Sequence, residues 1–210
     1  MKLYRFLLIT YILVQPIIIL SSHGKRPKTT ETLNDTQRRL QNAINSGNAQ
    51  AVRTIIQNNP EHIRRLAQQS GSSLLTTATD LGNSEVILAL TNAGFNPNQP
   101  NAKGQLPLEM AIINADPNAV NILTAGNANV NIQNRQGQFP LHAAAEWGQV
   151  DATTLEALIE NGVNLMLEDN QGHIAAEIAP FDSYLSYRTE LQAQEQGRTD
   201  IVRRIRNRFN

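Results

Sequence analysis

Residues 137–166 read GQFPLHAAAEWGQVDATTLEALIENGVNLM, and this pattern decides the fold because two earlier segments of the chain follow it. Residues 104–131 read GQLPLEMAIINADPNAVNILTAGNANVN. Residues 71–98 read GSSLLTTATDLGNSEVILALTNAGFNPN. A sequence that repeats itself at a fixed short period indicates similar structural units that stack in a row.

Two independent markers give the same period. Gly71, Gly104 and Gly137, at the starts of the units, are 33 residues apart. Asn98 and Asn131, near the ends of two units, are separated by the same interval. Because both markers share one register, the repeat is a property of whole units and not of a single short motif.

Each unit begins with a short helix whose ends are marked in the sequence. Pro107 and Pro140 stand where an apolar run begins, and proline in the first helical turn loses no needed hydrogen bond. Gly82 and Gly148 end this helix, because glycine adopts the left-handed conformation without a steric penalty. Ala115 takes this place in the middle unit, so we expect a less comfortable helix end there.

A second, longer helix follows in each unit. Its apolar residues recur at helical spacing: Val86, Ile87, Leu90, Val120, Leu123, Leu155, Leu158 and Ile159. Two short helices cannot bury their apolar faces alone, so neighbouring units must share one elongated core. The sequence therefore predicts an all-α repeat solenoid.

The units resemble the ankyrin repeat, whose pattern is close to GxTPLHxAAxxGHxxVVxLLLxxGADVN. The best matches are FPLHAAAEWG, NANVN and ALIENGVN, and the resemblance covers roughly residues 34–210. It implies an ankyrin-type helix-turn-helix repeat solenoid with short β-turn or hairpin loops. It also implies that His142 makes a structural hydrogen bond that pins a turn, and that Gly162 belongs to the structural motif.

The predicted repeat domain, residues 37–210, has three full units and two degenerate caps. The approximate unit boundaries are 37–67, 68–100, 101–133, 134–168 and 169–210. We expect the first cap to be a helical pair. In the last cap, residues 172–179 begin a unit, residues 180–196 are an insertion, and residues 197–205 resemble the missing second helix.

Residues 1–24 have the composition of a signal peptide. Basic Lys2 and Arg5 precede an apolar run at residues 6–20, and small polar residues follow it. The run is shorter than the roughly twenty residues that span a bilayer as a helix, so we expect export to the periplasm or the exterior. The alternative is an uncleaved membrane anchor. Residues 25–36 are polar and predict a flexible linker.

Composition excludes several classes of function. Eighteen Lys and Arg balance eighteen Asp and Glu, so no whole-chain field attracts nucleic acid, and we expect none as a partner. The absence of cysteine excludes thiol nucleophiles and Cys-ligated metals. No phosphate-binding loop, nucleophile elbow or His pair at metal-ligand spacing is present. We therefore expect no enzyme activity, metal or cofactor.

The strongest charge cluster is a set of arginines near the carboxyl end, interleaved with apolar residues. Its members are Arg198, Arg203, Arg204, Arg206 and Arg208. One interpretation is a handle for an acidic partner, nucleic acid or anionic lipid. The favoured interpretation is a terminal repeat helix that packs its apolar side on the preceding unit and leaves the arginines in water.

The resemblance also implies a binding surface, since ankyrin domains grip another protein or a peptide with their turn tips and first helices, which line a concave groove. The matching positions here are Asp80, Leu81, Lys103, Gln105, Ile113, Asn114, Arg135, Gln136, Gln138, Glu146 and Trp147. We expect Trp147, the single tryptophan, to be an exposed anchor. The alternative is a ring folded onto a neighbouring turn. We expect the protein to act as a monomer.

Overall fold

A computed structural model describes residues 31–69, 74–148, 150–179 and 183–207. The chain divides into two compact units, Met1–Asp35 and Thr36–Asn210. In the first unit, the Asp35 backbone N–H donates to Thr32 Oγ1 at 3.1 Å, which caps the start of a helix. The predicted signal or anchor at residues 1–24 lies outside the described residues, as does Gly71.

The described residues form helices and no strand, apart from one isolated antiparallel bridge between Glu168 and Ile174. This confirms the all-α prediction. The helices are α2 (Leu33–Asn45), α3 (Ala49–Asn58), α4 (Pro60–Gln68), α5 (Leu74–Asp80), α6 (Ser84–Asn92), α7 (Pro107–Ile113), α8 (Pro117–Ala125), α9 (Pro140–Glu146), α10 (Ala152–Glu160), α11 (Ala175–Ile178), α12 (Tyr184–Glu195) and α13 (Thr199–Asn207).

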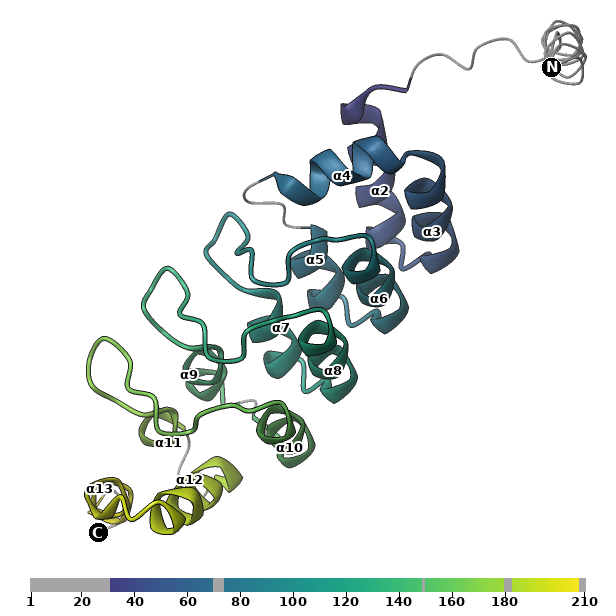
Figure 1. The fold of residues 1–210 in the computed structure, drawn as a ribbon. Helices are drawn as coiled ribbons and strands as arrows, with labels where there is room; N and C mark the ends of the chain where they lie inside the picture. Colours follow the sequence, from purple (N-terminus) through teal and green to yellow (C-terminus); the bar gives the residue numbers. More distant parts are fainter. Residues whose placement is uncertain (1–30, 70–73, 149, 180–182, 208–210) are drawn as a thin grey trace, which may run out of the picture. The chain divides into compact units, whose positions relative to one another are not determined.

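Two columns of helices run along the unit Thr36–Asn210 (Figure 1). The first helices α5, α7, α9 and α11 stack on one another. The second helices α3, α6, α8, α10 and α12 form the other column. Long turns project from the side of the first helices, between one unit and the next (Figure 1).

The core lies between the columns and is continuous from unit to unit. Leu90 of α6 and Leu123 of α8 are fully buried, and Leu158 of α10 is nearly so. The first helices add Leu75 and Ile112, which are also withdrawn from water. Since α6, α8 and α10 each pack against the equivalent helix before and after them, neighbouring units share this core.

The turns between units share one hydrogen-bonded design. In the turn 134–138 the Asn134 side-chain oxygen accepts from the backbone N–H groups of Gln136 and Gln138. Asn101 and Asp169 make the same pair of contacts in the turns 101–105 and 169–173. The fourth residue of each turn is a glycine at positive φ. These contacts fix the turn tips without any sheet.

The repeated asparagines tie adjacent units together. Asn131 Nδ2 donates to the carbonyl of Gly162, and Asn131 Oδ1 accepts from the Asn164 N–H. Asn98 makes the equivalent contacts with Asn127 and Asn129, one unit earlier. The asparagine that recurs in the sequence therefore links each unit to the next by two hydrogen bonds.

The middle unit has two left-handed residues that are not glycine. Ala115 has φ of 52°, at the place where Gly82 and Gly148 have 65° and 64°. Asn127 has φ of 70°, where the neighbouring units have Gly94 and Gly162. Asparagine tolerates this conformation, whereas the Cβ of alanine is strained there. The structure thus confirms the less favourable helix end that the sequence predicted at Ala115.

Replacing Ala115 by glycine should raise the free energy of unfolding by about 0.5–1 kcal/mol, because relief of the left-handed strain exceeds the extra entropy that glycine loses on folding. Urea denaturation followed by circular dichroism measures the change. Ala89→Gly, inside α6, is the matched control and should destabilise by about 1 kcal/mol. A decrease for both variants would contradict the assigned backbone conformation.

The ends of the repeat domain differ from the predictions. Helix α2 begins at Leu33, so residues 33–36 are helical and do not belong to the linker predicted at 25–36. The first cap contains three helices, α2, α3 and α4, instead of one pair. The sequence analysis missed that Pro60 starts a new helix directly after α3.

The last cap also differs. Helix α12, which lies within the predicted insertion 180–196, packs on α10 and so takes the second-helix place. Helix α13, predicted for that place, packs on α12 and α11. The motif at residues 197–205 is helical, but the longer α12 already covers the open end of the second column.

Candidate protein-binding face

The predicted binding residues belong to two kinds of element, which together we call the first-helix face. It consists of the turns 101–105, 134–138 and 169–173 and the carboxyl-terminal ends of α5, α7 and α9. Asp80 and Ile113 are the last residues of their helices, and Trp147 directly follows α9. The repeat geometry brings these positions side by side, because the first helices stack in register.

Large apolar side chains are exposed on this face. Trp147 is 66% exposed and Leu81 is 51% exposed. Asn114 takes the same position in the middle unit, and Ile113 beside it is half-buried. The indole of Trp147 therefore projects into water and is not packed onto a neighbouring turn among the described residues. A large apolar side chain left in water at such a position is available to a partner.

Two cavities open between successive units on this face. The first, of 380 Å³, lies between α5, α7 and the turn 101–105, and includes Asp80, Lys103 and Gln105. The second, of 520 Å³, lies between the turns 134–138 and 169–173 and includes Gln136, Gln138 and Glu146, together with other turn residues and Ile178. Six of the eleven predicted binding residues line these two cavities.

The remaining predicted residues hold the face in shape or stay exposed. The amide of Asn114 donates to the carbonyls of Thr79 and Asp80, which joins the ends of α5 and α7. Arg135 is exposed, and its stem lies against Gly104 of the preceding turn. Gln138 Nε2 donates to Glu146 Oε1 at 2.8 Å.

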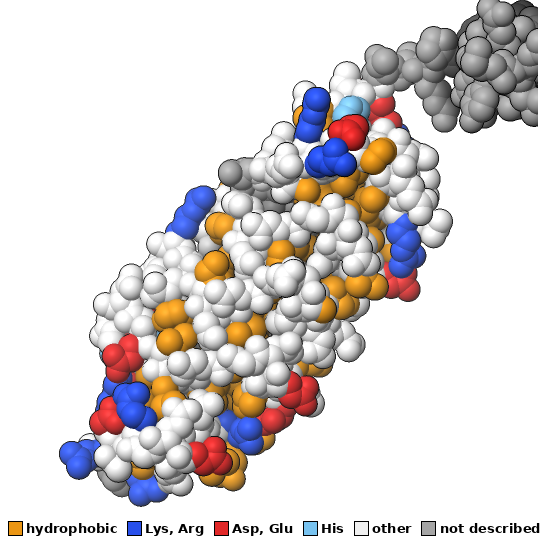
Figure 2. Space-filling model, viewed as in Figure 1, with side chains coloured by type: hydrophobic (Ala, Val, Ile, Leu, Met, Phe, Trp, Pro, Cys, Tyr) orange, Lys and Arg blue, Asp and Glu red, His pale blue; other side chains and the backbone are white. Residues whose placement is uncertain are grey.

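Charge on the molecule is sparse and gathers elsewhere. The view in Figure 2 shows a mostly uncharged surface, with charged side chains mainly toward the two ends of the stack. On the first-helix face the acids Asp80 and Glu146 are mixed with Lys103 and Arg135. This balance disfavours a partner of one strong charge and suits a surface of mixed polarity.

One position in the first helices α7, α9 and α11 carries a long polar side chain that bonds to a following element. His142 is buried, and its Nε2 donates to the carbonyl of His173 at 2.9 Å. The loss of hydration on burial lowers the pKa of His142, outweighing the opposing pull of this carbonyl and of Asp169. His142 is thus a neutral structural link to the turn 169–173, as the resemblance implies.

The sequence analysis missed the equivalents of His142. Glu109, at this position in α7, accepts from the backbone N–H of Leu106 and from Nδ2 of Asn134 in the next turn. Burial raises the pKa of Glu109 despite these two donors. Glu177 of α11 accepts from the Ile174 N–H in the same way. The interval of 33 or 35 residues between these positions was the signal that could have found them.

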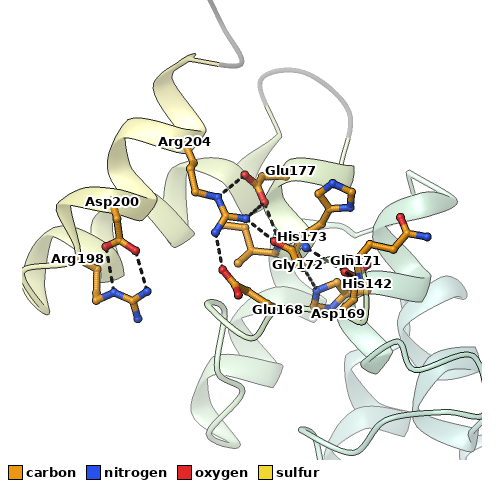
Figure 3. A network of polar contacts seen from close by, with 11 residues as sticks. His142, Glu168, Asp169, Gln171, Gly172, His173, Glu177, Arg198, Asp200 and Arg204 are labelled. Atoms are coloured by element: carbon orange, nitrogen blue, oxygen red, sulfur yellow. Dashed lines mark hydrogen bonds and ion pairs between the residues drawn. The ribbon is translucent and has the colours of Figure 1, made fainter.

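Arg204 of α13 completes the contact for Glu177 (Figure 3). Its Nε donates to Glu177 Oε1 at 2.8 Å, and its Nη atoms reach Glu177, Glu168 and the carbonyl of Gly172. Partial burial of Glu177 favours its neutral carboxyl and so raises its pKa. The hydrogen bonds from Arg204 and from the Ile174 N–H outweigh this effect, so the pKa of Glu177 lies below its ordinary value. The guanidinium therefore fastens the last helix to the turn 169–173 and α11.

Most of the described arginines in the cluster form ion pairs within the protein. Besides Arg204, Arg198 pairs with Asp200 and Arg206 pairs with Glu190. Ile201 and Ile205 of the same helix are buried. The interpretation as a terminal packing helix is thereby favoured over a handle for nucleic acid or lipid. Arg208 lies outside the described residues.

The described residues show neither a metal-binding group nor a membrane-spanning helix. No three His, Asp or Glu side chains in the described part of the chain come together as ligands for an ion. Within the same residues no helix combines the length and the apolar character needed to cross a bilayer. The apolar run 6–20 is outside the described part, so the predicted tether remains a prediction.

Comparison with known families agrees with this geometry. The sequence model described as ankyrin repeats (3 copies) matches residues 40–134 and 108–186. The chain therefore belongs to the ankyrin repeat family, whose repeats are protein–protein interaction modules. It is also similar to human cyclin-dependent kinase inhibitor 2A, with 26% identity over 140 residues that cover 67% of this chain and 80% of that protein.

Proposed function

We propose that this protein binds another protein or an extended peptide through the first-helix face, without catalysing a reaction. The observation that carries the proposal is the exposed indole of Trp147, held at the end of α9, which packs between α7 and α11, and next to Glu146, which lines a cavity. An aromatic side chain fixed on a rigid surface loses little entropy on binding, which makes it a typical energetic anchor.

The size and chemistry of the face support a protein as the partner. Three turns and the ends of three first helices give a surface on which a contact of about 800 Å² per partner is feasible. Apolar, amide and oppositely charged groups alternate along it, as in protein interfaces. The binding would make the chain an adaptor, an inhibitor or a stabiliser. The similarity to a protein named as a kinase inhibitor supports the inhibitor among these three.

The test is affinity capture by the full chain from its native compartment. A double variant, Trp147→Ala with Arg135→Ala, should recover at least tenfold less of the specific partner, because truncating one anchor costs about 2 kcal/mol or more. Leu88→Ala is the matched control, since Leu88 is 44% exposed but lies on α6, away from this face. Equal recovery by the double variant and the wild type would overturn the proposal.

We further propose that residues 1–24 direct export, with a membrane tether as the alternative. The support is the basic start and short apolar run of this segment. Amino-terminal sequencing of the protein from its native source separates the two. A first residue near 22–25 indicates a cleaved signal, whereas an intact Met1 indicates a tethered scaffold.

A further inference from the structure

Thr76 is the one described member of its positional series that makes no hydrogen bond to a following element. It occupies in α5 the place of Glu109 in α7, His142 in α9 and Glu177 in α11. Each of those longer side chains bonds to a following element. Thr76 is only 3% exposed, yet its hydroxyl has no hydrogen-bond partner among the described residues.

The space left by the short threonine is the 380 Å³ cavity of the first-helix face. Thr76 lines it together with Thr77, Met110 and the turn residues 101–103 and 105. Asn101, the equivalent of the Asn134 that bonds to Glu109, donates instead to Gln105 Oε1 within its own turn at 3.0 Å. A buried polar group without a hydrogen-bond partner is unfavourable, so a ligand that supplied a partner for the Thr76 hydroxyl would be stabilised in this cavity.

We propose that the cavity receives a glutamine or asparagine side chain of the protein partner, and this inference rests on the proposed function. Asp80 and Lys103 line the cavity, and neither forms an ion pair with another described residue. A carboxylate can only accept hydrogen bonds and an ammonium can only donate them. A primary amide carries both a donor and an acceptor, and therefore satisfies both groups at once.

Charged side chains fit this cavity less well. A carboxylate would pair with Lys103 but would meet the negative charge of Asp80. An ammonium or guanidinium group would pair with Asp80 but would meet Lys103. Thr76 and Thr77, which also line the cavity, carry neutral hydroxyls that can accept or donate a hydrogen bond. An amide gains these contacts without bringing a charge out of water.

Selection of a phage-displayed random peptide library on the full chain tests the inference. Peptides that bind the wild type but not Thr76→Glu should share a Gln or Asn at a fixed position. The Glu side chain is expected to fill the cavity and bond to Asn101, as Glu109 bonds to Asn134. The affinity of a selected peptide, measured by fluorescence anisotropy, should fall at least tenfold on Thr76→Glu. It should fall at least fivefold when its Gln is replaced by Glu or by Lys.

Thr76→Val is the second variant, since it keeps the shape of threonine and removes only the hydroxyl. It should weaken the Gln peptide severalfold while the Leu88→Ala control binds as the wild type does. Circular dichroism melting shows that each variant is folded. Equal affinity on wild type and Thr76→Glu, equal binding of the Glu or Lys peptide, or no peptide specific to the wild type would each overturn the inference. Peptides weakened by the Trp147 and Arg135 double variant but not by Thr76→Glu would leave the proposed function standing.

Discussion

Replacing Leu123 by alanine should lower the free energy of unfolding by about 3 kcal/mol. Leu123 is fully buried in α8, which packs between α6 and α10 in the middle of the stack. Deleting a buried leucine removes its transfer free energy and leaves a cavity, and the cost is generally about 2–5 kcal/mol. Because the two neighbouring units share this core, we also expect the unfolding transition to broaden as the halves uncouple.

Urea denaturation monitored by circular dichroism measures both effects. Leu88→Ala removes the same atoms from an exposed position on α6 and should change stability by less than about 0.5 kcal/mol. If the two leucines proved equivalent, the shared core described above would be wrong.

Replacing Arg204 by alanine should cost about 2 kcal/mol at pH 7. The change leaves the half-buried Glu177 without its cation and releases the carbonyl of Gly172. A fully buried pair would cost about 3–5 kcal/mol when broken, and partial exposure of both groups reduces this figure. Arg203→Ala on the same helix is the control, because Arg203 is exposed and has no ion-pair partner among the described residues.

The cost of losing Arg204 should depend on pH in a defined direction. Glu177 has a pKa below its ordinary value of 4.5, so it stabilises the fold above that value and the stabilisation is lost as the pH falls. The difference between wild type and Arg204→Ala should therefore be full at pH 7 and shrink below about pH 4.5. Glu109 has a raised pKa, so its contribution to stability depends on pH in the opposite direction. This contribution is the same in wild type and Arg204→Ala and therefore cancels in the difference between them. A difference that grew in acid would contradict the assigned contact.

The fold was predictable from the sequence because its determinants are local and periodic. Pro107 and Pro140 start helices, Gly82 and Gly148 end them, and the interval between Asn98 and Asn131 corresponds to hydrogen bonds between units. Each of these signals acts within one unit and recurs in the next. The ends were less predictable, since a cap is defined by what covers an exposed helix face and not by a repeated motif.

The parts of the candidate site that involve distant residues could not be predicted. The contact of Arg204 with Glu177 joins residues in two helices across an insertion, and no spacing rule connects them. The cavity beside Thr76 depends on the absence of a longer side chain, which a pattern search does not register. The positions on the first-helix face were placed by resemblance, and the structure adds their exposure and the two cavities.

Hydrogen–deuterium exchange of the full chain, with and without its captured partner, tests most directly whether the first-helix face binds. We expect the partner to slow exchange in the turns 101–105 and 134–138 and around Trp147, and to leave α6, α8 and α10 unchanged. Slower exchange confined to those second helices, with unaltered turns, would contradict the account.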